Sequence, residues 1–230
     1  MRRMLSVGMA ALVAVGSLVL TGCSVHNDDN VQPTIPVSYV SLYNESPDSP
    51  DLQFLVDGAQ IGNRAFSYSD YSAYLAFHTG ERTLQVGPFG ASNVVTDTTV
   101  TLQDNKFYSV FVVDDFNHAE LLVLADSGQA PATGKAKVRF VNLSPDAGSV
   151  QLKAAESAVG TALAFKGATE FIDVDAATKT FTISSADSAV KLNLPSQNLV
   201  AGRFYTFLVR GYKTPPAGNT NVLSADVIIN

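Results

Sequence analysis

The feature that most constrains the fold is a short stretch that occurs twice in the chain. Residues 40–48 read VSLYNESPD, and residues 138–146 read VRFVNLSPD. In both copies, an apolar run typical of a β-strand is ended by Ser-Pro-Asp, in which proline lacks a backbone donor and aspartate favours a turn. We interpret these motifs as structural turns, and they comprise Ser46, Pro47 and Asp48 in the first copy and Ser144, Pro145 and Asp146 in the second.

A binding role for these turns is the alternative, since Ser46, Asp48 and Asp51 offer oxygen atoms to calcium or a sugar. However, Asp51 corresponds to Ser149 in the second copy, and cation-binding loops need several acids and a glycine at set spacings. The structural interpretation is therefore favoured.

The two copies correspond over most of their length. The segment KFYSVFVV at 106–113 matches RFYTFLVR at 203–210, and TLQV at 83–86 matches TFTI at 180–183, both at an offset of 97 residues; the Ser-Pro-Asp turns match at 98. Such a steady offset predicts a tandem duplication, with repeats at 37–126 and 136–230. Residues 127–135 are small, polar and rich in breakers, so we expect them to form the linker.

The hydrophobic pattern within each repeat has the period of β-strands. Residues 99–102 and 190–194 alternate apolar and polar side chains, whereas 107–113 and 204–209 are almost continuously apolar, as in central strands. Turn residues divide each repeat into seven or eight short strands. We therefore predict an all-β fold of two tandem immunoglobulin-like β-sandwiches, with a short turn of helix at 156–164 as the one departure.

The amino terminus has the pattern of a processing signal. Two arginines precede an uncharged apolar stretch at 5–20, which is too short and wrongly flanked for a stable spanning helix. Residues 1–22 are therefore predicted to be a signal peptide. The sequence LTGC at 20–23 resembles the lipobox of bacterial lipoproteins, which implies cleavage before Cys23 and fatty acylation of that cysteine, for example with palmitate; the alternative is an ordinary secretory peptide with a chance cysteine.

Acylation of Cys23 would make the membrane a partner without any spanning segment, because two or more acyl chains anchor a protein firmly. Residues 23–36 comprise the lipidated cysteine and a polar, proline-bearing segment that we interpret as a tether. The expected location is the bacterial cell envelope, at the outer membrane or on its periplasmic or cell-surface face.

The charge balance argues against nucleic-acid binding, and the cysteine content excludes an internal disulfide. The net charge is −6, and removal of the signal peptide leaves 13 basic and 21 acidic residues, which is unfavourable for binding nucleic acid. Cys23 is the only cysteine, so no internal disulfide can form.

The order of motifs in the first repeat resembles domain of unknown function 4397. The resemblance rests on Ser-Pro-Asp, then Asp57-Gly58, an aromatic pair at Phe66 and Tyr74, and Thr-Leu-Gln-Val at 83–86 after a glycine turn. It covers residues 37–126 well and 136–230 less well, since Ala154-Ala155-Glu156 replaces the first repeat's Val-Asp-Gly. It implies an exported bacterial protein built of β-sandwich repeats, and it brings no activity, because the family has none established.

Signatures of catalysis or of cofactor binding are absent from the sequence. No nucleophile elbow, zinc-protease motif, phosphate-binding glycine loop or cysteine pair occurs, and His26, His78 and His118 lie far apart. Asp173 and Asp175 fall on one face of a predicted strand, where a solvated face is favoured over a cation or acid–base site. We therefore expect no catalytic residues, no metal and no cofactor.

Tyrosines form the most suggestive candidate for binding. Tyr68, Tyr71 and Tyr74 lie close together, and tyrosine suits both sugar stacking and protein interfaces. Tyr74 corresponds to Phe171 and is expected in the core. Tyr68 and Tyr71 are peculiar to the first repeat and form the candidate binding patch, the alternative being partly buried loop aromatics.

These features favour a non-catalytic envelope lipoprotein whose modules bind or adhere to a protein or glycan. The alternative is a purely structural envelope or matrix subunit that acts through sheet edges or end-to-end contacts. A carbohydrate-active enzyme, whose acids meet only in the fold, is less favoured. Two facing carboxylates in a cleft would indicate the enzyme, and an exposed tyrosine would indicate the binder.

Overall fold

The computed structural model describes residues 35–126 and 128–230. Residues 35–230 form one compact unit. The predicted signal peptide, Cys23 and nearly all of the tether lie outside the described residues. In the part of the chain that the structure describes, no helix has the length and apolarity needed to cross a membrane.

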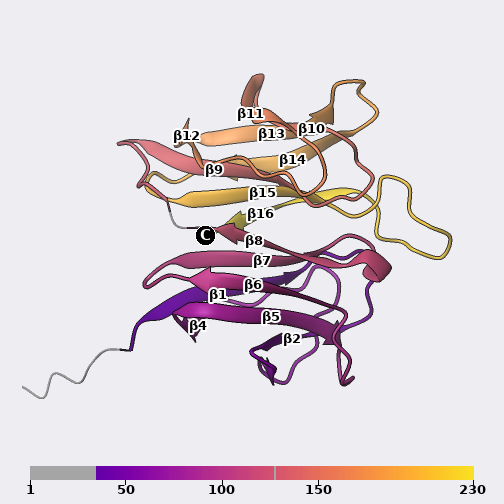
Figure 1. The fold of residues 1–230 in the computed structure, drawn as a ribbon. Helices are drawn as coiled ribbons and strands as arrows, with labels where there is room; N and C mark the ends of the chain where they lie inside the picture. Colours follow the sequence, from indigo (N-terminus) through magenta and orange to yellow (C-terminus); the bar gives the residue numbers. More distant parts are fainter. Residues whose placement is uncertain (1–34, 127) are drawn as a thin grey trace, which may run out of the picture. The chain divides into compact units, whose positions relative to one another are not determined.

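The first half of the unit is a β-sandwich of two four-stranded sheets (Figure 1). Sheet 1 has the strand order β4-β1-β7-β8 and sheet 2 the order β3-β2-β5-β6, and β1 and β7 pair in parallel. The strands are β1 (Val37–Asn44), β2 (Leu52–Val56), β3 (Ala59–Gln60), β4 (Leu75–His78), β5 (Gly80–Pro88), β6 (Thr96–Leu102), β7 (Phe107–Val113) and β8 (Glu120–Ala125), with a 3₁₀ turn η1 (Phe116–His118) between the last two.

The second half repeats this arrangement strand for strand. Sheet 3 has the order β12-β9-β15-β16 and sheet 4 the order β11-β10-β13-β14, and β9 and β15 again pair in parallel. The prediction of an all-β fold with two immunoglobulin-like sandwiches is confirmed. The strands are β9 (Lys135–Asn142), β10 (Val150–Ala154), β11 (Ser157–Leu163), β12 (Ile172–Asp175), β13 (Thr178–Ser185), β14 (Lys191–Asn198), β15 (Phe204–Arg210) and β16 (Ser224–Ile229).

The prediction of a short helical turn at 156–164 is wrong, because this segment forms strand β11 of a hairpin. It pairs with β10, placing the buried Val159 opposite Leu152. The hairpin turn forms without Asp-Gly, since Ala155 adopts φ +50°, close to the +51° of Asp57 in the first sandwich. Pairing to β10 and burial of Val159 therefore outweigh the local preference of this segment.

Each sandwich has its own apolar core, and a third cluster joins the two sandwiches. The cores are built around Phe54 and Leu84 in the first sandwich and around Phe140 and Phe181 in the second. The third cluster packs sheet 1 against sheet 3, with buried residues Tyr43, Phe111, Val113, Val141, Leu143 and Leu208. Sheets 1 and 3 are thus covered on both faces, which explains why β7 and β15 are almost continuously apolar.

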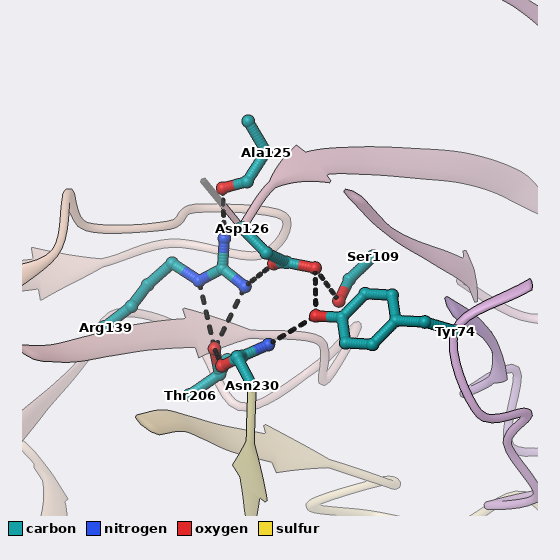
Figure 2. Close-up of polar contacts among 7 residues, drawn as sticks. All are labelled: Tyr74, Ser109, Ala125, Asp126, Arg139, Thr206 and Asn230. Atoms are coloured by element: carbon teal, nitrogen blue, oxygen red, sulfur yellow. Dashed lines mark hydrogen bonds and ion pairs between the residues drawn. The ribbon is translucent and has the colours of Figure 1, made fainter. Parts of the chain in front are cut away.

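A buried ion pair crosses this interface at one end. Arg139 on β9 binds Asp126, which follows β8, with Nη2 2.6 Å from Oδ1, and the two side chains are 4% and 1% exposed. The same guanidinium donates to the Thr206 hydroxyl and to the Ala125 carbonyl (Figure 2). Since a buried charge is costly unless it is paired and hydrogen-bonded, each of the two ions depends on the other.

The other oxygen of Asp126 accepts hydrogen bonds from the first sandwich, and one of its donors is in turn contacted by the second (Figure 2). The hydroxyls of Tyr74 and Ser109 donate to Oδ2 at 2.8 and 2.7 Å, and the side-chain amide of Asn230 donates to the Tyr74 oxygen. Burial and the nearby Asp126 carboxylate raise the pKa of Tyr74 well above its usual value, so it remains a donor. The network fixes how the two sandwiches meet.

Candidate functional site

The candidate site is a groove between sheets 1 and 3, with a volume of about 410 Å³. One wall is formed by β1 and residues 69–74, and the other by β15 and β16. We call it the Tyr71 groove, after the most exposed aromatic side chain in its lining. Its ionisable residues other than tyrosine are Glu45, Arg210 and Asp226.

A stack of three aromatic rings runs from the interface core to the groove. Phe111 packs on Tyr43 with ring centroids 4.7 Å apart, and Tyr43 packs on Tyr71 at 5.7 Å with the planes only 17° apart. Tyr71 is 64% exposed, whereas Tyr43 is 4% exposed. The outermost ring therefore stacks on a buried ring and leaves most of its own surface exposed.

Backbone pairing to β1 holds the segment that carries Tyr71. Tyr71 forms an isolated bridge with Tyr43, and the hydroxyl of Ser72 accepts from the Leu42 N–H while the Ser41 hydroxyl donates to the Ser72 carbonyl. Ser69 adopts φ +68°, which turns the chain into this pairing. The ring position is thus set by neighbouring strands rather than by a free loop.

Three residues in the groove lining, Glu45, Arg210 and Asp226, are joined by ion pairs, and we call them the ionic relay. Arg210 on β15 donates from Nη1 to both Glu45 carboxylate oxygens, at 3.0 and 3.3 Å, and from Nη2 to Asp226 Oδ2 at 2.9 Å. Glu45 comes from the first sandwich and is 1% exposed, while the Asp226 side chain is 54% exposed. Burial raises the pKa of Glu45 to about 7, against the opposing effect of the Arg210 guanidinium.

Of the two predicted binding tyrosines, only Tyr71 lines the groove. Tyr68 is half-buried, and its ring centroid lies 5.9 Å from the guanidinium carbon of Arg210. Its buried hydroxyl has no hydrogen-bond partner among the described residues, and burial raises its pKa far above the usual value. Tyr68 thus lies beside the relay and turns its polar end inward.

The first Ser-Pro-Asp turn forms hydrogen bonds both within its own sandwich and with the second sandwich. The Ser46 N–H donates to Asn44 Oδ1, and Asp48 Oδ1 accepts from the Phe116 N–H in the β7–β8 connection. The Pro47 carbonyl accepts from the side-chain amides of two asparagines in the β15–β16 loop, Asn219 and Asn221.

The second Ser-Pro-Asp turn forms equivalent hydrogen bonds within the second sandwich. The Ser144 N–H donates to Asn142 Oδ1, and the Ser144 hydroxyl donates to the Gly211 carbonyl. The Asp146 carboxylate accepts from the N–H groups of Lys213 and Thr214. Pro145 lies between these two anchors and is partly exposed. These contacts account for the motif as a link from β1 or β9 to the last connection of each sandwich.

The acids considered as a carboxylate pair face lysines on the neighbouring strand. Asp173 lies opposite Lys137 and Asp175 opposite Lys135 in the β12–β9 pairing, and each acid contacts its lysine, at 3.2 and 2.5 Å. They form cross-strand ion pairs on a sheet edge. Within residues 35–126 and 128–230, no three His, Cys, Asp or Glu side chains are grouped as a metal site requires.

At the equivalent position, the second sandwich lacks the stacked tyrosines of the Tyr71 groove. The bridge between Tyr43 and Tyr71 has its counterpart in a bridge between Val141 and Ala168. The corresponding hollow has Ala168 in its lining, together with Phe171 and with Arg139, which pairs with Asp126. Only the first sandwich therefore presents a stacked tyrosine at the interface.

From the sequence, we did not identify Glu45, Arg210 or Asp226 as site residues. Two signals were nevertheless present: Glu45 occupies the place of the apolar Leu143 in the other copy, and Arg210 ends an apolar strand that the first repeat continues with Val113. Both charges replace an apolar residue of the matching repeat, and a charge in an otherwise apolar run is rarely buried unless it is paired.

Comparison with known proteins adds a family and two distant structural likenesses. No curated protein matches the chain. A family CBM26 module, CBMbc of Eubacterium rectale Amy13K, solved with maltoheptaose, has 11% identity and a TM-score of 0.25, covering 79% of this chain and all of its own. The tip fimbrial protein Mfa3 of Porphyromonas gingivalis has 10% identity and a TM-score of 0.23, covering 84% of this chain and 99% of its own. Likeness at this level says nothing of ligand or function.

The family match rests on sequence. The model of the domain of unknown function DUF4397 matches residues 38–153. This range is slightly more than half of the chain and runs from β1 through the whole first sandwich into β10. The chain belongs to the DUF4397 family.

Proposed function

We propose that this protein is a lipid-anchored component of the bacterial envelope whose sandwiches bind a glycan in the Tyr71 groove without catalysis. The observation that carries the proposal is the exposed ring of Tyr71, which lines the groove and is stacked on the buried Tyr43. A sugar ring has an apolar face of C–H groups, and a rigid aromatic surface flanked by polar groups is suited to it.

The state of the carboxylates supports binding rather than turnover. A glycosidase needs two carboxyl groups facing the scissile bond, one as acid and the other as nucleophile or base. Here Glu45 and Asp226 bind the same guanidinium, and Glu45 is 1% exposed. The raised pKa of Glu45 would suit an acid, but its burial beneath Arg210 keeps it from a substrate.

The edge strands give less support to a purely structural subunit. Assembly through sheet edges needs a long strand whose outer side can pair with another chain. One of the two edge strands of sheet 4, β14, carries Lys191 and Pro195, and both residue types hinder such pairing. We therefore place the function in the groove.

The duplication and the anchor complete the proposal. Matching strand orders and the matching bridges at Tyr71 and Ala168 support an origin of the two sandwiches by tandem duplication. We propose that cleavage leaves an acylated Cys23, and that residues 24–36 form a tether reaching about 45 Å at roughly 3.5 Å per residue.

Replacing Cys23 with alanine is expected to move the protein from the membrane fraction to the soluble fraction. The acyl chains supply the membrane affinity, so their loss should not alter the folded unit at 35–230. Fractionation of cells, with circular dichroism of the released protein, measures both effects. Unchanged membrane partition of the variant would contradict the anchor.

Replacing Tyr71 with alanine is expected to weaken glycan binding at least tenfold, about 1.4 kcal/mol, while the protein remains folded. Alanine already stands at the corresponding position of the second sandwich, Ala168, where the same bridge forms. The measurement is a glycan array followed by calorimetric titration with residues 24–230. Phe89→Ala, which removes a 43% exposed aromatic from another surface, is the matched control.

The proposal fails if no saccharide binds the wild-type protein, or if Tyr71→Ala and Phe89→Ala lower the affinity equally. Binding of a protein ligand alone would also overturn it.

A further inference from the structure

We infer that the Tyr71 groove selects uncharged saccharides and rejects anionic ones, and that Asp226 is the residue that sets this preference. The inference rests on the proposed glycan-binding function and deepens it. The inference follows from which charged groups in the groove are already paired within the protein and which are exposed.

The single guanidinium in the groove lining is already occupied. Arg210 directs Nη1 to both oxygens of Glu45 and Nη2 to Asp226, and its side chain is only 16% exposed. A carboxylate or sulfate on a ligand would therefore compete for this cation with two carboxylates of the protein that already bind it. Arg210 is thus a structural cation and not an anion receptor.

The exposed charge in the groove lining is negative, and the exposed Arg64, which donates to the Tyr71 carbonyl, lies outside that lining. Asp226 has a side chain that is 54% exposed, and one of its oxygens accepts from Arg210 while the other accepts from the Val227 N–H. Each carboxylate oxygen has a second lone pair, so Asp226 retains capacity to accept from ligand hydroxyls. A sugar with two neighbouring hydroxyls is a suitable donor, whereas an anionic group would be repelled.

Other polar groups in the lining are uncharged. Ser69 is exposed and Ser72 is partly exposed, and both lie on the segment that carries Tyr71. Two carboxylates and one guanidinium therefore leave the groove with an excess of negative charge when Glu45 is ionised. The whole chain, with a net charge of −6, adds to this field.

The test compares neutral oligosaccharides with counterparts that differ only by oxidation of C6 to a carboxylate. With residues 24–230 at low salt, we expect each neutral ligand that binds to do so about five- to tenfold more tightly than its oxidised partner. The difference should shrink as the salt concentration rises. Equal affinity for the two members of every pair would overturn the inference.

Replacement of Asp226 gives a sharper outcome. Asp226→Ala removes the exposed charge and frees Arg210 Nη2, so the neutral ligand should bind more weakly and the oxidised ligand more tightly. Asp226→Asn retains the shape of the side chain and should likewise reduce the discrimination. Asp97→Ala, which removes an exposed acid from the edge strand β6, is the matched control and should leave the preference unchanged.

The results separate the two proposals. If no saccharide of either class binds, the proposed function fails. If binding depends on Tyr71 but both Asp226 variants lower the affinity for neutral and oxidised ligands by the same factor, the inference alone is wrong.

Discussion

Replacing Arg139 with methionine is expected to lower the free energy of unfolding by about 3–5 kcal/mol. Methionine fills a similar volume, but it leaves the carboxylate of Asp126, whose side chain is 1% exposed, without its counter-ion. The Thr206 hydroxyl and the Ala125 carbonyl lose a hydrogen-bond partner in the same substitution. Chemical denaturation followed by tyrosine fluorescence and circular dichroism measures the effect.

A matched control is available on the surface of the same interface. Lys166 contacts Glu120 at 2.8 Å, also between the second and first sandwiches, but the two side chains are 37% and 55% exposed. Lys166→Met should cost no more than about 1 kcal/mol, because water screens exposed pairs. A loss of less than 1 kcal/mol in Arg139→Met would show that the buried pair does not hold the sandwiches together.

A double variant distinguishes the interaction energy of the Arg139–Asp126 pair from the contributions of the other residues that contact them. Asp126→Asn retains one oxygen that can accept from both Tyr74 and Ser109, and it removes the charge. In combination with Arg139→Met, it should cost clearly less than the sum of the two single changes, since the second change removes the unpaired ion left by the first. Additive costs would contradict a direct interaction.

Local pattern predicted the strands and turns of this chain well, because alternation and turn chemistry act over a few residues. The apolar runs at 107–113 and 204–209 became β7 and β15, and Asp57-Gly58 became a hairpin turn. The segment at 156–164 was the exception, since its place in a strand depends on pairing with β10.

The interface was not predicted, because it depends on contacts between residues far apart in sequence. Glu45 and Arg210 are 165 positions apart, and Asp126 was assigned to the end of a domain rather than to a buried network. Tyr71 was identified because the second repeat lacks it, but its stacking on Tyr43 requires the fold. The available signal was a charge at a position that is apolar in the other repeat, at Glu45 and at Arg210.

The stability of the protein is expected to fall as pH rises from about 4.5 to about 7, and Glu45 is the cause. Burial raises the pKa of Glu45 from 4.5 to about 7 in the folded state. Between these values the folded state binds a proton that the unfolded state has released, so each increase in pH favours unfolding. The contribution of Glu45 is fully present below pH 4.5 and is lost as pH rises through about 7, a change on the order of 3 kcal/mol.

Glu45→Gln should remove this dependence, because glutamine does not titrate and can still accept a hydrogen bond from Arg210. Free energies of unfolding measured at several pH values from 4.5 to 8 should therefore vary much less in the variant than in the wild-type protein. Glu120→Gln removes an acid from an exposed ion pair and serves as the control, in which the slope should persist. Should the wild-type slope survive in Glu45→Gln, another group must be responsible, and the burial of Glu45 would no longer explain the dependence of stability on pH.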